Sequence, residues 1–202
     1  MALGDPYATL DELKGRLDVK VADTLDDTEL DAARDSVSRD IESWCERQFN
    51  DAGAASARRY RPLTGDLALV DDFHSTTGLI VETSIDGSTW EMWDATDYEL
   101  EPIDGIVGGQ PGWPFWRIVA VGSRRFPCAR RTTVRVTAQW GWAAVPGPVK
   151  EACLLLAGES FKLPDAPFGV VGFGEFGAVR VRDNPFAQRK LVPYRLHPVL
   201  VA

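Results

Sequence analysis

The sequence predicts an α+β protein, in which a helical core carries an inserted small antiparallel β-sheet or sandwich and ends in an extended C-terminal arm. Two patterns favour this fold class. Apolar residues recur at helical spacing towards the two ends of the chain, whereas short alternating runs separated by Pro- and Gly-rich connections fill the middle. With 202 residues, 45% of them hydrophobic, the chain is long enough for one packed core and a small insert.

Two helices are expected in residues 1–56, the N-terminal part of the helical core. Thr9 and Glu12 have the spacing of a capping box, in which each side chain accepts from an amide at the start of the helix. A longer helix is predicted over residues 27–48, with acidic residues at its positively polarised N-terminal end. Its buried face is expected to consist of apolar residues at three-to-four spacing: Leu30, Ala33, Val37, Ile41, Trp44 and Cys45.

Residues 57–144 are expected to form the β insert. Asp86 and Gly87 mark a hairpin turn, because Gly and Asp tolerate the positive φ that such turns need. Several short strands at regular spacing are typical of a small antiparallel sheet or sandwich. The segments predicted to be extended are residues 58–62, 66–70, 78–85, 98–101, 116–121 and 132–140.

Residues 145–183 are expected to complete the core. Pro146 and Pro148 suit the first turn of a helix, where the amides have no intrahelical partner, and the apolar helix that follows is expected to lie centrally. A glycine-rich turn and a short strand at residues 178–182 come next. The tail, residues 184–202, is apolar, cationic and interrupted by proline, so we expect it to be buried against another polypeptide as a docking arm.

The charge is distributed unevenly along the chain, whose formal net charge is −8. Residues 1–51 carry 14 acidic and 6 basic side chains, whereas residues 178–202 carry 1 acidic and 5 basic side chains. An acidic body argues against holding DNA by phosphate neutralisation. Arginine clusters at 58–61 and 124–131 are instead expected to meet acidic patches on neighbouring copies, as in a ring built head to tail.

Motifs that could carry catalysis are absent or out of context. The residues from Gly172 to Gly177 match G-x-G-x-x-G, but a helix precedes them and a strand follows, the reverse of a nucleotide site. His74 and His197 have no acid or nucleophile at a diagnostic spacing, and no set of metal ligands has a recognisable register. Cys45, Cys128 and Cys153 are expected to be unreactive thiols. The sequence therefore predicts no catalytic residue, no metal and no cofactor.

Targeting signals are not evident either. No apolar run approaches the roughly 20 residues that span a bilayer, and the N-terminal residues lack the basic and apolar regions of a signal peptide. We therefore expect assembly in a cytoplasm without a membrane partner.

Seven tryptophans leave a different function open, that of a carbohydrate- or protein-binding β module with helical flanks. This alternative requires Trp113 and Trp116, the pair expected to be most exposed, to form an aromatic platform. Filling of the core and of interfaces is the favoured role for these residues. A small nucleotide-using enzyme is a further alternative, and it requires the glycine-rich loop to open a helix.

The last third of the chain carries a recognisable pattern. It comprises the W-G-W-x-x-V-P junction at Trp140, the apolar helix, the G-F-G-x-F-G-A-V-R-V turn and strand from Gly172, and the closing L-x-P-Y-R at Leu191. The opening Y-A-T-L-D-E-L at Tyr7, followed by an acidic helix, is also similar. Together these features resemble head-to-tail adaptors of long-tailed actinobacteriophages, also called head–tail connector or head completion proteins, over about half the chain.

The resemblance implies a structural virion protein at the head–tail interface. Such a protein forms a ring, usually of twelve copies, beneath the portal protein, joins the DNA-filled capsid to the tail and extends the channel for passing double-stranded DNA. The far face of the ring meets a stopper or tail-side connector protein. Carried over to this chain, the portal-binding residues are Phe186, Arg189, Lys190, Leu191, Tyr194, Arg195 and Leu196. The residues expected at subunit interfaces are Arg58, Arg59, Arg61, Phe173, Phe176 and Arg180.

Overall fold

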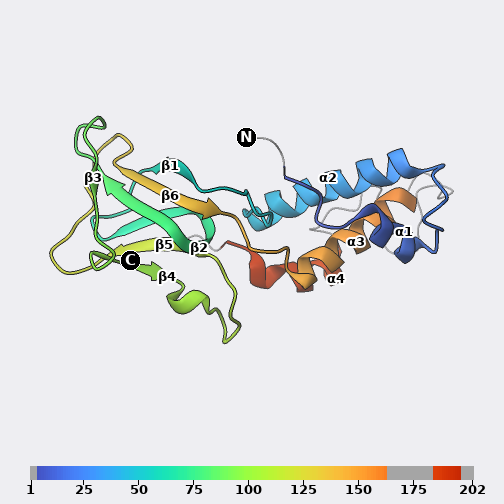
Figure 1. Ribbon diagram of the computed structural model, residues 1–202. Coiled ribbons are helices and arrows are strands. Elements are labelled where there is room, and N and C mark those ends of the chain that lie inside the picture. Colours follow the sequence, from blue (N-terminus) through green and yellow to red (C-terminus); the bar gives the residue numbers. More distant parts are fainter. Residues whose placement is uncertain (1–3, 163–183, 197–202) are drawn as a thin grey trace. The chain divides into compact units, whose positions relative to one another are not determined.

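The computed structural model describes residues 4–162 and 184–196 and divides the chain into two compact units (Figure 1). The helical unit comprises Met1–Phe49 and Val145–Ala202, and the β unit comprises Asn50–Ala144. Helices and a six-stranded antiparallel sheet confirm the predicted α+β class. Within the described ranges, no helix is both long and apolar enough to cross a membrane.

The helical unit begins with two helices that start where local signals predict. α1 (Leu10–Leu17) has the capping box: the Glu12 amide donates to the Thr9 hydroxyl at 3.2 Å, and the Thr9 amide donates to the Glu12 carboxylate at 2.8 Å. α2 (Asp27–Cys45) ends three residues earlier than predicted, because Glu46 adopts a left-handed conformation with φ of 55°. α2 buries its apolar face against α3 (Gly147–Lys162), which supplies the centre of the unit.

The described part of the predicted arm is helical, not extended. Asn184 caps α4 (Pro185–Leu191) by accepting from the amides of Phe186 and Ala187 at 3.0 and 2.9 Å, and Pro185 occupies a first-turn position where no amide is needed. A short 3₁₀ helix, η4 (Val192–Tyr194), continues the chain. α4 packs on α3 of the same unit. Asn184-Pro185 starts a helix and does not interrupt one, so the extended conformation predicted for these residues is wrong.

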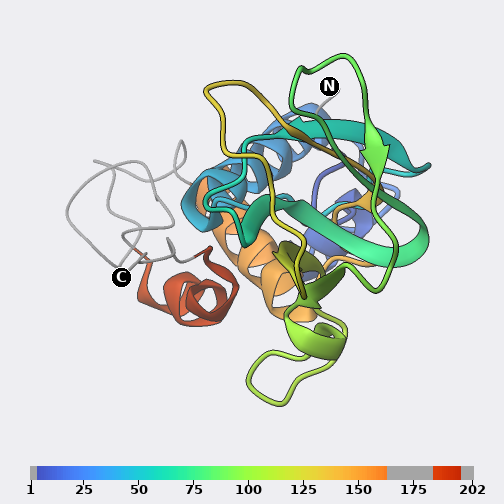
Figure 2. The ribbon, with the colours of Figure 1, turned by 90° about the vertical axis from the view of Figure 1, so that its left-hand side faces the viewer.

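The β unit contains one strongly curved antiparallel sheet with the order β1-β6-β2-β5-β4, and β3 pairs with β2 (Figure 2). Its centre is β2, which is a single long strand where the sequence predicts two shorter ones. The first part of β2 pairs with β5 and the second with β6, and register shifts separate the two parts. The strands are β1 (Ser56–Tyr60), β2 (Leu67–Thr83), β3 (Glu91–Met92), β4 (Tyr98–Glu101), β5 (Phe115–Ala120) and β6 (Val134–Trp140).

The concave face of the sheet holds an apolar core. Phe73 lies where β2 passes from one partner strand to the other, and its ring contacts those of Phe115 and Trp140 at 5.5 and 6.0 Å between centroids. Other residues alternate inward along the strands, as the period of two requires. The fully buried aliphatic members of this core are Ala68, Val81, Ile118, Val134, Val136 and Ala138.

The first and last residues of the β unit are joined to each other. Asp51 and Gly141 form an antiparallel bridge, the Ala52 amide donates to the Trp140 carbonyl at 2.9 Å, and the Trp142 amide donates to the Asn50 carbonyl at 3.3 Å. Gly141 has a φ of +90°, and a Cβ at this position would lie only 1.8 Å from the Asn50 carbonyl oxygen. Only glycine fits this junction.

Candidate interaction surfaces

The C-terminal segment, residues 184–196, has an inner and an outer face within the helical unit. Leu191 and Ala187 on α4 are fully buried, and the Tyr194 ring packs edge-on against Phe49 at 6.0 Å. The Leu196 amide donates to the Cys45 carbonyl at 2.8 Å. Three of the seven residues predicted to bind a partner, Leu191, Tyr194 and Leu196, therefore contribute to the attachment of this segment to its own unit.

The charged residues of the C-terminal segment divide in the same way. Lys190 donates to Glu151 on α3 at 2.8 Å, and this hydrogen bond lowers the pKa of the Glu151 carboxyl. The Arg195 guanidinium lies over the Trp44 ring at 5.4 Å. Arg189, in contrast, is exposed and forms no ion pair with any described residue.

The outer face of α4 is apolar as well as cationic. Phe186 is 62% exposed, and Val192, one residue beyond α4, is 50% exposed. Asn184 fixes the start of this helix, because its side-chain amide donates to both carboxylate oxygens of Glu159 at 3.0 and 2.8 Å. The helical unit therefore presents Phe186, Arg189 and Val192 on a helix that is capped and anchored from within. We call these three residues the α4 outer face.

The three arginines of β1 and the residue after it have different roles. Arg58 pairs with Asp71 at 2.6 Å and lies over the Trp140 ring at 4.6 Å, so it belongs to the concave side of the sheet. Tyr60 donates to the same Asp71 at 2.9 Å, and burial together with this carboxylate raises the pKa of the Tyr60 hydroxyl. Arg61 is exposed and has no ion pair among the described residues.

Arg59 lies on the opposite side of the sheet. Its guanidinium is 5.5 Å from the centroid of Trp90, and Arg135, its register partner on β6, lies over the same ring at 4.4 Å. Arg135 also makes two hydrogen bonds of 2.5 Å to Glu82 on β2. Trp90 therefore contacts two guanidinium groups, of which only Arg135 is also held by a carboxylate.

The second arginine cluster, residues 124–131, also separates into paired and unpaired members. Arg124 bonds Glu91 and Asp97, and Arg125 pairs with Asp66 at 2.8 Å. Arg130 is exposed without an ion pair among the described residues, and Arg131 donates to the backbone carbonyl of Asp86. We call the four arginines of the β unit that lack an ion pair within the described ranges the arginine edge: Arg59, Arg61, Arg130 and Arg131.

A buried lysine in the helical unit was not predicted. Lys14 on α1 is 1% exposed, forms an ion pair with Asp27, and donates to the carbonyls of Val21 and Asp23 at 3.2 and 2.6 Å. It thereby holds the α1–α2 turn, residues 18–26, from within. The available signal was its position four residues after Leu10, on the apolar stripe of the helix.

Aromatic residues expected on the surface are partly buried. Trp113 packs against the buried Trp142 at 5.1 Å and lies 6.3 Å from Trp116, while the Trp142 indole donates to Asp72 at 2.9 Å. Trp93 is also buried and stacks on Phe126 at 4.5 Å. Trp113 and Trp116 do not form an exposed pair, so the specific requirement of the carbohydrate-binding alternative is not met.

Groups with potential reactivity are dispersed. Burial raises the pKa of the Cys45 thiol to about 12 and also raises that of Cys153, whereas Cys128 is exposed. Across residues 4–162 and 184–196, no group of three or more His, Cys, Asp or Glu side chains could hold a metal ion. The glycine-rich loop with Phe173 and Phe176, as well as Arg180 and His197, lies outside the described residues.

Comparison with known proteins finds similarity only in three-dimensional structure. No protein-family model and no curated protein matches the sequence. The fold is similar to chains in the neck of an empty GTA particle computed with C6 symmetry and in the virion of a native gene transfer agent (GTA) particle, each with a TM-score of 0.61 and 18% identity. A chain in the neck of a native GTA particle computed with C12 symmetry gives 0.55 and 17%. Each match covers 100% of this chain and 96% of the other.

Proposed function

We propose that the chain is a structural component of the neck of a phage-like particle, where it forms a ring beneath the portal and joins the DNA-filled capsid to the tail. The observation that carries this proposal is the extent of the fold similarity. The matches include the whole of this chain and nearly the whole of each neck or virion chain, so they extend beyond a single common module. This role depends on shape and surface chemistry and requires no catalytic residue.

The sequence motifs support the same proposal independently. The resemblance to head-to-tail adaptors of actinobacteriophages rests on the segment around Trp140 and on the closing residues from Leu191, not on the fold comparison. Twelve copies is the proposed ring size, and one of the similar neck structures was computed with C12 symmetry. The proposed neighbours are the portal protein on one side and a stopper or tail-side connector on the other.

We assign portal contact to the α4 outer face. Phe186 and Arg189 offer an exposed aromatic ring and a cation without an ion pair in the described residues, a combination enriched at the centres of protein interfaces. The remaining predicted portal-binding residues, including Leu191 and Lys190, have contacts within their own unit and position the helix. Because Asn184 and Glu159 fix the helix start, the outer face requires little ordering on binding.

The overall charge suits a ring through which DNA passes. The chain carries a net charge of −8, so twelve copies would place a high density of negative charge around the channel. Negative charge repels phosphates and releases no counterions from DNA, and binding that depends on counterion release is therefore avoided. We propose that double-stranded DNA passes without sequence-specific contacts.

The test is reconstitution on capsids that contain the portal and DNA but lack this protein. Purified wild-type chain is added, and the portal vertex is imaged by electron cryomicroscopy. A ring of density beneath the portal is the expected result. If no density appears with the folded wild-type chain, the neck function is wrong.

A surface variant tests the portal contact separately. Phe186→Ser combined with Arg189→Glu changes only exposed side chains of α4, and we expect it to abolish or greatly reduce vertex density. Ile103→Ser is the matched control, because Ile103 on the β unit is 59% exposed against 62% for Phe186. Equal density from both variants would retain the neck function and reject the assigned portal surface.

A further inference from the structure

We propose that the arginine edge of the β unit binds the α1–α2 turn of a second copy of this chain. The inference rests on the proposed function, in which copies adjoin within a ring, and it names the two surfaces that meet. One surface is cationic with an exposed isoleucine, and the other is acidic with exposed aliphatic side chains. Each is built within one unit.

Arg61 and Arg131 of the arginine edge lie on chain segments that are joined by backbone hydrogen bonds. The Thr133 amide donates to the Tyr60 carbonyl at 3.2 Å, and the Ser84 amide donates to the Thr133 carbonyl at 2.9 Å. These bonds bring together the end of β1, the residues before β6 and the turn after β2. Arg61 and Arg131 extend from the first two segments, and Ile85 from the third is 82% exposed.

Within the β unit, these arginines are distinguished by the absence of a carboxylate partner in the described residues. All nine cationic side chains of Asn50–Ala144 are arginines. Five of the nine form ion pairs within the unit: Arg58, Arg117, Arg124, Arg125 and Arg135. The other four constitute the arginine edge, where the guanidinium groups remain able to bind carboxylates from another chain.

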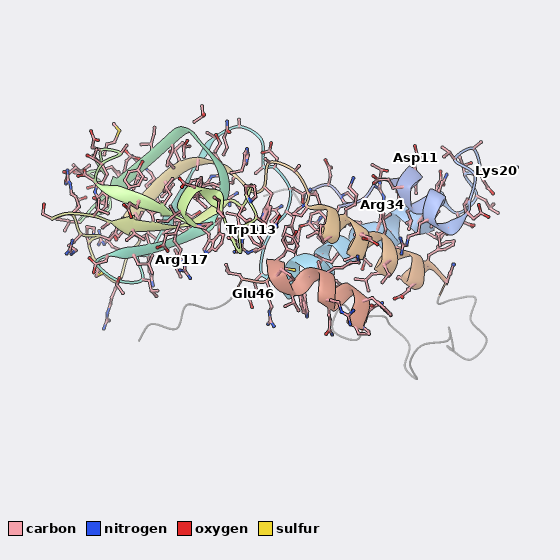
Figure 3. The ribbon with its side chains drawn as sticks, turned by 90° about the horizontal axis from the view of Figure 1, so that it is seen from below. Asp11, Lys20, Arg34, Glu46, Trp113 and Arg117 are labelled. Atoms are coloured by element: carbon pink, nitrogen blue, oxygen red, sulfur yellow. The ribbon has the colours of Figure 1, made fainter. Side chains whose placement is uncertain are left out.

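The α1–α2 turn has the complementary composition. Leu25 is 84% exposed and Val21 is 58% exposed, the two largest such values among the aliphatic residues of the helical unit that the structure describes. Exposed carboxylates surround them, and Figure 3 shows Lys20 of this turn extending from the unit beyond α1. The exposed acidic residues of the turn and of the adjoining start of α2 are Asp18, Asp23, Asp26 and Glu29.

The turn is also held in a defined shape. Lys14 donates to two of its carbonyls and pairs with Asp27, where α2 begins. Asp23 adds a bond of 3.2 Å from the Leu25 amide to its own carboxylate. A buried cation thus fixes a segment whose apolar side chains face solvent. Such preorganisation lowers the entropy lost when the segment binds a partner.

Another copy fits the arginine edge better than nucleic acid does. Ile85 and Met92, on the segments flanking the Arg59–Trp90 contact, are 82% and 65% exposed, and a phosphate backbone would leave these apolar groups without a complement. The β unit as a whole has 9 basic and 12 acidic residues, a net charge of −3, which disfavours DNA at long range. The α1–α2 turn supplies both carboxylates and aliphatic side chains.

The test uses two charge-reversed variants at residues whose side chains form no ion pair or hydrogen bond in the described part of the chain. The edge-reversed variant carries Arg61→Glu and Arg130→Glu, and the turn-reversed variant carries Asp26→Lys and Glu29→Lys. Asp23 and Asp27 are left unchanged because they hold the turn. A combined variant carries all four substitutions. Circular dichroism and thermal unfolding establish that each variant is folded.

Self-association is measured by analytical ultracentrifugation at low ionic strength up to about 1 mM, the order of the effective concentration of copies placed side by side on a platform. We expect wild-type association that weakens with added salt, because the contact is charged. Each reversed variant alone should associate about tenfold or more weakly. An equimolar mixture of the two should regain wild-type association, because each reversed surface then meets an opposite charge on the other chain.

The combined variant and a matched control complete the design. The combined variant should associate like the wild type, because both surfaces are reversed. Lys162→Glu with Ser36→Glu and Ser43→Glu gives the same net charge as the edge-reversed variant, −8 − 2 − 1 − 1 = −12, on exposed residues of the helical unit. This control should also associate like the wild type. If its self-association is weakened as much as that of the edge-reversed variant, net charge alone explains the effect and the inference is wrong.

Three further results would overturn it. The first is a wild-type chain that stays monomeric up to the highest concentration, and the second is normal association of the reversed variants. The third is association regained by the combined variant but not by the mixture, because that result would place the contact within one chain. Retention of duplex DNA by the wild type, lost only on edge reversal, would instead assign the edge to phosphates. The proposed function is read from density at the capsid vertex and so fails or succeeds independently.

Discussion

The two units use cations in opposite ways. The helical unit encloses Lys14, whose ammonium group is surrounded by carbonyl oxygens and a carboxylate, whereas every lysine or arginine of the β unit is an arginine and none of them is buried. A compact ammonium suits a small cavity lined with oxygens, and a planar guanidinium suits stacking on Trp90 or Trp140 beside a carboxylate. In the first unit a buried cation therefore fixes internal structure, and in the second five arginines pair with carboxylates of the unit while four carry no ion pair within the described residues.

The largest test of this comparison is removal of the enclosed cation. Lys14→Met keeps the volume but leaves Asp27 and two carbonyls without their donor, and we expect unfolding of the helical unit to become easier by about 4 kcal/mol. Hydrogen exchange should accelerate in α1 and α2 and remain unchanged in the β unit. Lys20→Met, at an exposed position, is the control, and a similar loss there would contradict the role assigned to Lys14.

Removing an apolar anchor should have the next largest effect. Leu191 is fully buried, so Leu191→Ala should cost about 3 kcal/mol in the free energy of unfolding of the helical unit. Val192→Ala, one residue further and half exposed, should cost about 0.5 kcal/mol or less. Denaturant titration compares the two. Equal effects would mean that α4 is not packed on its own unit in solution.

A conservative change of cation should have a smaller effect in the β unit. Arg58→Lys retains the charge opposite Asp71 but loses the planar group above Trp140, and we expect a loss of about 1 kcal/mol. Trp fluorescence during denaturant unfolding reports the change. Arg61→Lys serves as the control because Arg61 is exposed, and its expected effect is close to zero. If Arg58→Lys leaves the free energy of unfolding unchanged, stacking of the guanidinium on Trp140 does not contribute to stability.

The smallest expected effect concerns acid titration of the turn after β2. Asp86 accepts from the amides of Thr89 and Ser88, both at 2.8 Å, and these bonds hold the pKa of its carboxyl well below the ordinary value. The stabilisation is present above the unfolded-state pKa and is lost as pH falls through the lower folded-state value. When the pH is lowered, carboxyl chemical shifts measured by NMR should therefore show that Asp86 is protonated at a lower pH than an ordinary aspartate. Titration at an ordinary pKa would contradict this.

Local signals in the sequence predicted the helical unit better than the β unit. Thr9 and Glu12 specify the start of α1 through neighbours three residues apart, and the turn at Asp86 is equally local. The single strand β2 could not be predicted, because its polar middle around Ser75 is paired by β6, a partner about sixty residues away. The alternation of apolar and polar residues indicates which side chains are buried, but it does not indicate which neighbouring strand forms the backbone hydrogen bonds.

The sequence indicates which residue types to expect in the candidate surfaces, but not which individual residues belong to them. The sequence draws attention to the arginine clusters, yet Arg58 pairs with Asp71 whereas Arg61, three residues later, has no ion pair among the described residues, a difference that only the fold determines. Lys14 was missed because a lysine among leucines is most often exposed. The helix from Asn184 is not evident from sequence, because a proline in a short segment is compatible both with a chain interruption and with the first turn of a helix.

The junction at Gly141 would allow the β unit to be replaced as a whole. Because its incoming and outgoing strands are bonded to each other at Asn50 and Ala52, the remainder of the chain needs to supply only two closely spaced attachment points. A different domain with adjacent termini, or a short loop, could be grafted in its place without lengthening either connection. The sequences of the helical unit and of the β unit can thus diverge at different rates, provided that glycine is retained at position 141, where the first and last segments of the β unit meet.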